Sequence, residues 1–267
     1  METFTRKNGY NFNRQGYPRP QKSYFGKHFH DYYELLLFKT GNIRFIVENR
    51  CYQPKMNDLL IFPPGAYHFA EVLSSDVPYD RFVLQFDKTE IDQHLLDHIF
   101  REIRCINLNA LPDILGWFER FHGYIQRYPE EQFAAIDRHL ICELLMLLAE
   151  QAVLEKHENH EIHVSKSHPV ITKALEYIER NFAAIHAVED IAEALFISKT
   201  HLFYCFKKYL DISPIRYVQA KKLLYARQLI KNGAKPTEVN EKCGIPEYTT
   251  FFRLYKKQFG FPPSKNK

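Results

Sequence analysis

The stretch Phe206–Pro214, FKKYLDISP, recurs 49 positions later as Tyr255–Pro263, YKKQFGFPP. Each copy begins with an aromatic residue and two lysines, continues through two apolar positions and ends at a proline. Self-similarity over about 50 residues indicates one supersecondary unit that the chain uses twice. The residues around each copy therefore decide what the unit is.

The first copy begins within the second helix of a predicted helix–turn–helix. Glu189 and Asp190 lie in the first turn of a short helix, where the helix dipole favours acidic residues. A Phe196-Ile197 turn then leads to Ser198, a preferred N-cap residue for the next helix. That helix is amphipathic: one face carries Leu202, Cys205, Phe206 and Tyr209, and the other carries Lys199, Thr200, Phe203, Tyr204 and Lys207.

The second copy has the same plan. Cys243 and a Gly244-Ile245 turn precede a helix that buries Phe251 and Tyr255. Between the copies, Ser213–Ile230 is predicted as one long helix. A helix with a polar and aromatic face after a tight turn suits reading of the DNA major groove. The predicted DNA-binding residues are Lys199, Thr200, Phe203, Tyr204, Lys207, Tyr248, Thr249, Phe252, Arg253 and Lys256.

The charge distribution supports a polyanionic partner for this segment. Residues 1–164 hold 18 Lys and Arg against 23 Asp and Glu, a net charge of −5. Residues 165–267 hold 18 against 9, a net charge of +9. Such asymmetry is typical of a segment that meets a polyanion, and by itself leaves DNA, RNA and anionic lipid open.

The remaining composition indicates a globular cytoplasmic protein. The chain has 267 residues, 45% of them hydrophobic and 25% charged, and is long enough for two domains. We expect no membrane span and no secretion, because apolar runs are short and the first 16 residues are polar. The five cysteines are widely spaced and form no C-x-x-C pair, which argues against a disulfide framework.

Residues 169–267 resemble the DNA-binding domain of AraC/XylS-type bacterial transcription regulators. The matching residues are Asp190-Ile191-Ala192, Phe206-Lys207-Lys208, Tyr217, Ala226-Arg227 with Leu229, Gly244, Phe251, Arg253 and Gly260–Ser264. The sequence departs from the family at Phe203-Tyr204, where a polar residue and Arg are common, at Asn240, where a small Ala is usual, and at Lys265-Asn266, which replaces the usual Tyr-Arg. The resemblance implies a double helix-turn-helix in which Arg253 is the arginine positioned to read guanine.

Residues 24–88 are predicted as short strands. Ile43, Phe45 and Val47 alternate with Arg44, Ile46 and Glu48, the period of a strand with one buried face. This segment resembles a cupin barrel, through His28-x-His30-x3-Glu34-x6-Gly41 and Asn57-x5-Pro63-x-Gly65-x2-His68. Asn57 replaces the usual Gly of the second motif, and Val72 stands where Asn is common.

The cupin resemblance implies that His28, His30, Glu34 and His68 meet at one barrel mouth. Such a set is able to hold a divalent transition metal, and a metal-dependent cupin enzyme, a dioxygenase or isomerase, is the alternative function. In AraC-type regulators the barrel resembles a metal-free effector pocket, so we expect neither metal nor cofactor. The predicted ligand-binding residues are His28, His30, Glu34, Arg44 and His68, with Tyr32, Tyr67 and Arg81 as further candidates.

Three other segments complete the prediction. Helices are predicted over 91–99, 111–128 and 133–154, and the broad apolar face of the last suits burial in the same chain or a subunit interface. The polar segment 155–168 carries four histidines and is predicted as a linker rather than a metal site. The aromatic and basic arm Phe4–Tyr24 is expected to close over the pocket or to lack fixed structure.

The sequence thus predicts an α+β multidomain protein: a cupin-like β-barrel with flanking helices, then an all-α double helix-turn-helix. The predicted boundaries are 1–90 for effector sensing, 91–156 for dimerisation, 157–168 for the linker and 169–267 for DNA binding. The predicted function is a ligand-responsive transcription regulator, an activator rather than a repressor, which senses a small polar molecule, with a sugar favoured. Its expected partners are double-stranded DNA, that effector, a second copy of the chain and RNA polymerase, without a membrane.

Overall fold

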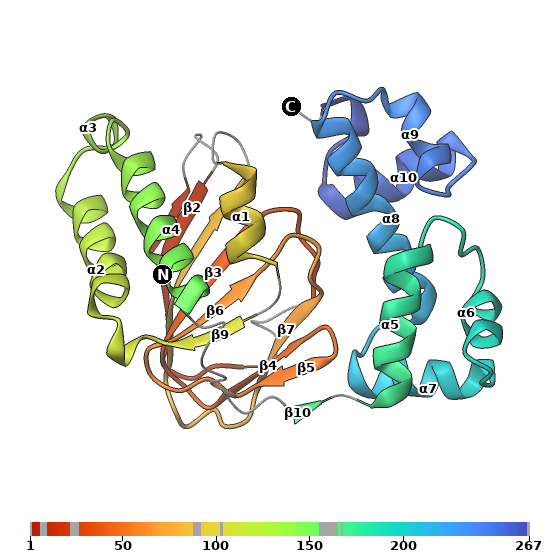
Figure 1. Ribbon diagram of the computed structural model, residues 1–267, viewed down its shortest axis with the longest axis horizontal. Helices are drawn as coiled ribbons and strands as arrows, with labels where there is room; N and C mark the ends of the chain where they lie inside the picture. The colour runs from red at the N-terminus through yellow and green to blue at the C-terminus, as the bar shows by residue number, and fades with distance from the viewer. Residues whose placement is uncertain are drawn as a thin grey trace. The chain divides into compact units, whose positions relative to one another are not determined.

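The computed structural model describes residues 2–5, 10–21, 27–87, 92–101, 104–154, 165–166 and 168–265. The chain divides into two compact units, one holding most of residues 1–164 and the other centred on residues 165–267. Figure 1 shows the first as strands covered by helices and the second as helices, and each unit is described by itself below. In the described part of the chain, no helix combines the length and the apolar character that a membrane span requires.

The first unit is built on two antiparallel sheets. The larger has the strand order β1-β2-β8-β3-β6-β9, and in the smaller β5, β4 and β7 are neighbours in that order. The strands are β1 (Glu2–Thr5), β2 (Tyr10–Tyr17), β3 (Tyr33–Thr40), β4 (Ile43–Val47), β5 (Arg50–Tyr52), β6 (Asp58–Phe62), β7 (His68–Val72), β8 (Tyr79–Phe86) and β9 (Arg104–Asn107).

Alternation along the strands builds two hydrophobic layers. On β3, Leu35 and Leu37 belong to a core shared with helices, whereas Leu36 and Phe38 belong to a core between the two sheets. Strand β4 alternates as predicted, and its buried residues line the same inter-sheet core. A strand places successive side chains on opposite faces, so the larger sheet is buried on both sides.

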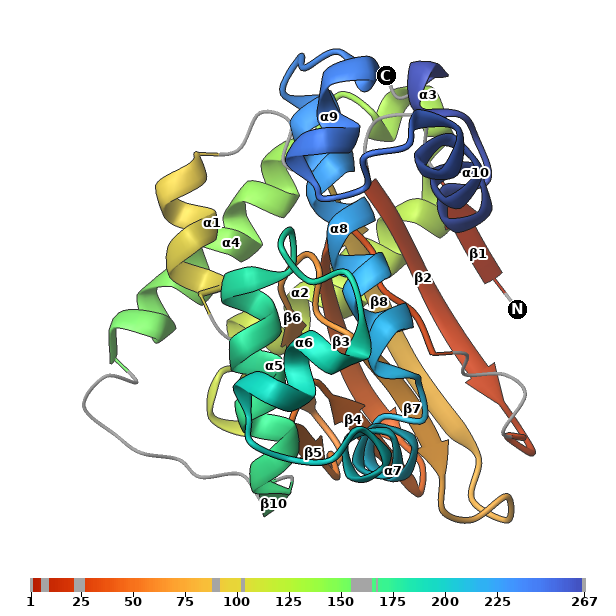
Figure 2. The same ribbon diagram turned by 90° about the vertical axis from the view of Figure 1, so that its right-hand side faces the viewer.

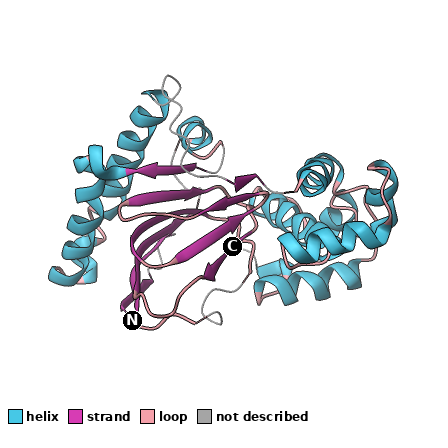
Figure 3. Ribbon diagram, turned by 90° about the horizontal axis from the view of Figure 1, so that it is seen from below, coloured by secondary structure: helices cyan, strands magenta, loops and turns pink. Residues whose placement is uncertain are grey.

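Helices cover the outer face of the larger sheet (Figure 3). They are α1 (Gln93–Ile99), α2 (Pro112–Arg127), α3 (Glu130–Phe133) and α4 (Asp137–Leu154), with a short 3-10 turn η2 (Leu108–Ala110). Trp117 of α2 is buried and donates its indole N–H to the Leu140 carbonyl at 2.7 Å. On α4, the buried residues Ile141, Leu144, Leu145 and Leu148 pack into this core, so part of its apolar face is covered by the chain itself.

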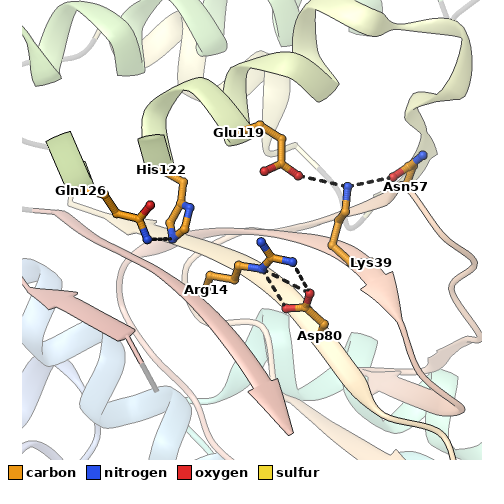
Figure 4. A network of polar contacts seen from close by, with 7 residues as sticks. All are labelled: Arg14, Lys39, Asn57, Asp80, Glu119, His122 and Gln126. Carbon is orange, nitrogen blue, oxygen red and sulfur yellow. Dashed lines mark hydrogen bonds and ion pairs between the residues drawn. The ribbon is translucent and has the colours of Figure 1, made fainter. Parts of the chain in front are cut away.

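Polar contacts tie the rim of the sheet together and connect it to α2 (Figure 4). Arg14 of β2 pairs with Asp80 of β8, with Nη2 and Oδ2 2.7 Å apart. Lys39 of β3 reaches Glu119 of α2 at 3.3 Å and donates to Asn57 Oδ1 at the same distance. The contact between Lys39 and Glu119 thus connects β3 to α2 beside the hydrophobic layer.

Two segments differ from the prediction. Residues 10–17, expected within an arm over the pocket or without fixed structure, form β2, which pairs with β8 from Tyr10↔Phe86 to Tyr17↔Tyr79. Residues 104–107, expected among helices, form β9 and pair with β6. In each case a short segment gains its backbone hydrogen bonds by pairing with a strand that is distant in the sequence. Local sequence patterns do not identify that partner.

The second unit is helical apart from the two-residue strand β10 (Ser165–Lys166). Its helices are α5 (Pro169–Asn181), α6 (Val188–Ala194), α7 (Lys199–Tyr209), α8 (Pro214–Lys231), α9 (Pro236–Lys242) and α10 (Tyr248–Phe259), followed by the 3-10 turn η4 (Pro263–Lys265). Ser198 caps α7 as predicted, because its Oγ accepts the His201 N–H at 3.1 Å. Gly260 ends α10 in the left-handed conformation.

Within this unit, α8 joins two helix pairs (Figure 2). We call α6–α7 the first helix pair and α9–α10 the second. Lys222 of α8 is buried, and its Nζ donates to the Ile185 carbonyl before α6 at 2.7 Å and to the Gly244 carbonyl before α10 at 2.8 Å. One side chain therefore bonds to the backbone of both pairs.

Gly244 supplies a second contact between the pairs. Its φ is +73°, and a Cβ added there would lie 1.8 Å from the Ala183 carbonyl oxygen. Only glycine allows both this backbone conformation and this approach. The two pairs are thus held at a short backbone–backbone contact next to Lys222.

Candidate functional sites

Helix α7 presents the side chains predicted to face DNA. Leu202, Cys205 and Phe206 are buried against the helical unit. The opposite face is exposed and carries Lys199, Thr200, Phe203, Tyr204 and Lys207. Two aromatic side chains are unusually solvent-exposed for their size: Phe203 is 36% exposed and Tyr204 is 57% exposed.

Helix α10 repeats this arrangement. Phe251 and Tyr255 are fully buried, and the opposite face exposes Tyr248, Thr249, Phe252, Arg253 and Lys256. Each helix therefore shows a polar and aromatic face about three turns long, preceded by a shorter helix and a turn. A face of this size and chemistry is able to reach base edges and phosphates in a DNA groove.

The cations on these faces differ in their partners. Lys199 pairs with Glu189, and Lys207 pairs with Asp211 one turn further along the helix. In the part of the chain that the structure describes, no carboxylate pairs with Arg253. Both lysine pairs are exposed and weak, so a phosphate is able to replace the carboxylate.

The structure brings together four of the five predicted ligand-binding residues. One nitrogen or carboxylate oxygen from each of His28, His30, Glu34 and His68 lies within 4.8 Å of the others. We call this set the histidine cluster. Three of its members are buried, and His28 is exposed.

Neighbouring contacts fix the orientation of the histidine cluster. His28 and His68 form a backbone bridge, in which each N–H donates to the other's carbonyl at 3.3 Å. The His68 Nδ1–H donates to the Ala66 carbonyl at 3.0 Å, so Nε2 is the nitrogen that faces Glu34, with 3.8 Å between Nε2 and Oε2. The Phe62 ring stacks on the His68 ring at 4.6 Å.

The structure does not bring Arg44 into this group. Arg44 alternates with Ile43, Phe45 and Val47, whose side chains fill the inter-sheet core, so it points to the other face of β4. There its guanidinium pairs with Glu71 of β7 at 2.5 Å, and that contact raises the pKa of Arg44. The sequence analysis correctly predicted which residues of β4 are buried. That alternation directs Arg44 away from the inter-sheet core, so it conflicts with the assignment of Arg44 to the pocket.

Further polar side chains line the inter-sheet face of β2 and β8, and the sequence analysis selected only Arg81 among them. Gln85 donates to Glu34 Oε2 at 3.2 Å, and Asn11 donates to Gln85 Oε1 at 3.1 Å. Arg81 donates to Gln15 Oε1 at 2.7 Å and to the Tyr79 hydroxyl at 2.5 Å. We call Asn11, Asn13, Gln15, Arg81 and Gln85 the polar row.

The part of the polar row on β2 has a weak local signal in the sequence, although the strand's partner does not. Tyr10 and Phe12 alternate with Asn11 and Asn13, which is a strand pattern with a polar inner face. Burial of amides and a guanidinium is costly unless they are hydrogen-bonded. Asn11, Gln15, Arg81 and Gln85 make such bonds, whereas the buried Asn13 Oδ1 has no partner among the described residues. A row of such groups beside the histidine cluster offers donors and acceptors to a polar ligand.

A sheet unit with buried polar groups and a basic helical unit with two exposed helix faces define the chain as a DNA-binding regulator of the ligand-sensing class. Family models agree: residues 16–149 match the AraC-like ligand binding domain, and residues 191–266 match a helix-turn-helix domain. The chain belongs to the AraC family of transcriptional regulators. The curated relatives described next are named as transcriptional regulators.

Individual relatives share moderate identity. The chain is 25% identical over 195 residues to the HTH-type transcriptional regulator ArgR of Pseudomonas aeruginosa, covering 71% of this chain and 55% of ArgR. It therefore spans about half the length of that relative. It is 20% identical over 274 residues to the transcriptional activator RhaS of Enterobacter sp., covering 92% of this chain and 88% of RhaS.

Among solved structures, apo ToxT from Vibrio cholerae aligns over 97% of this chain and 98% of its own, with 14% identity and a TM-score of 0.42.

Proposed function

We propose that this protein is a ligand-responsive, sequence-specific transcriptional regulator that reads DNA through two helix-turn-helix motifs. The motifs are the first and second helix pairs, with α7 and α10 as their recognition helices. The observation that carries this proposal is the repeated pair of exposed polar and aromatic faces, joined by one helix and by Lys222. Recognition helices held about one DNA turn apart contact successive major-groove segments on one face of the duplex.

Each recognition helix has its own reading chemistry. Arg253 on α10 donates two parallel hydrogen bonds to guanine O6 and N7. On α7, Phe203 and Tyr204 contact thymine methyl groups, while Lys199, Lys207 and Lys256 bind phosphates. The departure from the family pattern at Phe203-Tyr204 thus gives the first motif an apolar specificity in place of an arginine-based one.

The effector in this proposal is a small polar molecule, with a sugar favoured, bound by the histidine cluster. The polar row supports this assignment, because its amides and guanidinium match a ligand that carries several hydroxyl groups. The effector acts by binding two arrangements of the protein with different affinity. RhaS, a relative of this chain, is named a transcriptional activator, which supports activation as the direction of the response.

The proposal also assigns the other segments. Residues 1–90 sense the effector, 91–156 dimerise two copies, 157–168 link the units and 169–267 bind DNA in the cytoplasm, with RNA polymerase as a further partner. The exposed side chains of Ile136, just before α4, and of Met146 on α4 support the dimerisation role. Residues 157, 160 and 163 of the linker lie outside the described residues, and the boundaries remain a prediction.

DNA-fragment selection tests the proposed function directly. The full-length protein is incubated with a random DNA pool at near-physiological salt, with and without a mixed-sugar pool, and bound fragments are sequenced. We expect one enriched motif with two half-sites about one helical turn apart, and enrichment that changes with the sugars. A selection that enriches no motif under either condition refutes the proposal. The Arg253→Ala variant is the matched control for base reading.

A further inference from the structure

We propose that Phe196, in the turn between α6 and α7, is a DNA-reading residue whose ring contacts a thymine methyl group in the major groove. Among the large hydrophobic side chains of the described residues, it is the most exposed, at 96%. The inference rests on the proposed function and deepens it, because it names a chemical group on the DNA that the first helix pair recognises. Phe196 and its neighbours all belong to the helical unit.

The turn holds Phe196 in a backbone conformation that favours glycine. Its φ is +55°, in the left-handed region, which is rare for a bulky residue. The Phe196 N–H donates to the Glu193 carbonyl at 3.1 Å. The Ile197 N–H donates to the Ala192 carbonyl at 3.0 Å. These two bonds form the Schellman motif that ends many helices, in which the left-handed position is usually glycine.

The second helix pair has the same turn with glycine in place of phenylalanine. The Gly244 N–H donates to the Glu241 carbonyl at 2.9 Å, and the Ile245 N–H donates to the carbonyl of residue 240 at the same distance. Gly244 has a φ of +73°, so it occupies the position that Phe196 occupies in the first pair. The fold therefore accepts glycine at this position of the turn and does not require an aromatic ring there.

Packing within the chain does not explain the phenylalanine. Because the Phe196 side chain is almost fully exposed, folding removes little of its apolar surface from water. The ring therefore contributes little stability to offset the strained backbone. Residues held in such sparsely populated conformations cluster at functional sites. An exposed aromatic ring in a strained turn is thus placed for contact with a second molecule.

The position of the turn identifies DNA as that molecule. Ser198, two residues further along the chain, caps α7, and the exposed residues 199–200 begin this helix. The N-terminal residues of a recognition helix contact base edges, so Phe196 enters the groove beside them. Phe203 and Tyr204 carry further exposed aromatic rings on the same helix. Phe196 therefore extends the DNA-facing surface of α7 into the turn that precedes it.

The chemistry of the turn favours a base methyl group over the DNA backbone. A phenyl ring has no hydrogen-bonding group, and the thymine methyl is the apolar group that the major groove presents. Glu193, exposed near the end of α6, repels phosphate and disfavours a close approach of the turn to the backbone. The Glu189 carboxylate, also on α6, pairs with Lys199. The first helix pair thus reads thymine through Phe196 as well as through α7.

Replacement of single thymines by deoxyuridine tests the contact, because deoxyuridine lacks only the 5-methyl group. The full-length chain is titrated by fluorescence anisotropy onto the selected DNA site and onto copies that carry one such replacement each. We expect Phe196→Gly to weaken binding to the unmodified site by about 10–100-fold, which corresponds to the loss of one buried phenylalanine contact. One replacement should weaken binding of the wild-type chain by about 3–5-fold and leave binding of Phe196→Gly unchanged.

Three controls separate the contact from effects of folding and charge. Phe196→Gly should unfold in urea at the same midpoint as the wild-type chain or at a higher one, since glycine relieves the left-handed strain. The slope of log affinity against log salt concentration should not change, because an apolar contact releases no counterions. Met56→Ala removes another exposed apolar side chain, in the sheet unit, and should bind every DNA as the wild-type chain does.

Two results would overturn the inference: equal affinity of the wild-type and Phe196→Gly chains for the selected site, or the same affinity ratio between the two chains on every modified DNA. The first would leave the ring for a protein partner such as RNA polymerase, and the second would identify a sugar contact. Either result leaves a selected motif, and hence the proposed function, intact. A selection that enriches no motif refutes the proposed function and this inference together.

Discussion

Replacing Gly244 with alanine should damage the helical unit far more than the same change at Gly233. Both glycines have positive φ, +73° and +91°, so both substitutions incur the backbone strain of an L-residue, about 1–2 kcal/mol. At Gly233 a new Cβ meets no atom within 4 Å. At Gly244 it would lie 1.8 Å from a backbone oxygen, so the two helix pairs must separate by more than 1 Å.

The additional cost at Gly244 has two sources. Overpacking of a rigid contact costs about 1–3 kcal/mol. Separation of the pairs also lengthens at least one of the Lys222 hydrogen bonds, each worth about 1.5–3 kcal/mol when the donor is charged. We therefore expect Gly244→Ala to lower the unfolding free energy by at least about 2 kcal/mol more than Gly233→Ala.

Urea unfolding of the two full-length variants measures this difference. Circular dichroism at 222 nm follows the helices, and fluorescence of Trp117, the only tryptophan, follows the sheet unit as an internal control. The helical transition of Gly244→Ala should move to lower urea, while the fluorescence transition stays in place. Unfolding free energies of the two variants that agree within about 0.5 kcal/mol would refute the reasoning. The contact between Gly244 and the Ala183 carbonyl would then yield to a Cβ at little cost.

The other predictions concern both units. Lys222→Met should destabilise the helical unit by about 2–3 kcal/mol in urea unfolding, since two buried carbonyls lose their charged donor; an unchanged midpoint would exclude the bridge. Arg253→Ala should cost about 1–3 kcal/mol on the selected DNA site and relax discrimination at one base pair; equal loss on all sequences would identify a phosphate contact instead. DNA affinity of the full chain should fall steeply with salt in a titration by fluorescence anisotropy, and a flat response would contradict the role of the +9 charge. Burial raises the pKa of Tyr79 to about 12, so the folded state keeps a proton that the unfolded state loses near pH 10; stability should fall between pH 10 and 12, less so in Tyr79→Phe, as measured by urea unfolding at each pH.

Local patterns predicted the elements whose signals lie within one short segment. The alternation of Ile43, Phe45 and Val47 gave β4 its buried face, and Ser198 marked the start of α7. These features depend on backbone geometry and on nearest neighbours in the sequence. The proximity of the four members of the histidine cluster was implied by the cupin resemblance, whereas their role in binding a ligand stays a prediction.

Long-range features escaped prediction for a physical reason. Strand β2 exists because β8, more than 60 residues away, offers it an edge, and its inner face is polar, so its composition is typical of a surface arm. Strand β9 is too short for a periodic signal and depends on β6. The hydrogen bonds of the polar row and the Lys222 bridge arise from tertiary packing, so no local pattern contains them.

The bridge at Lys222 and Gly244 has a consequence for the promoters that this protein would use. Because the two helix pairs are held by a backbone contact, the distance and the rotation between their recognition helices are fixed. One inserted base pair moves a half-site by about 3.4 Å and turns it by about 35° around the duplex, since a turn is about 34–36 Å and 10–10.5 base pairs. Target sites would therefore tolerate substitutions within a half-site more readily than a change in the distance between half-sites. The spacing would be the most constrained property of these promoters over evolutionary time.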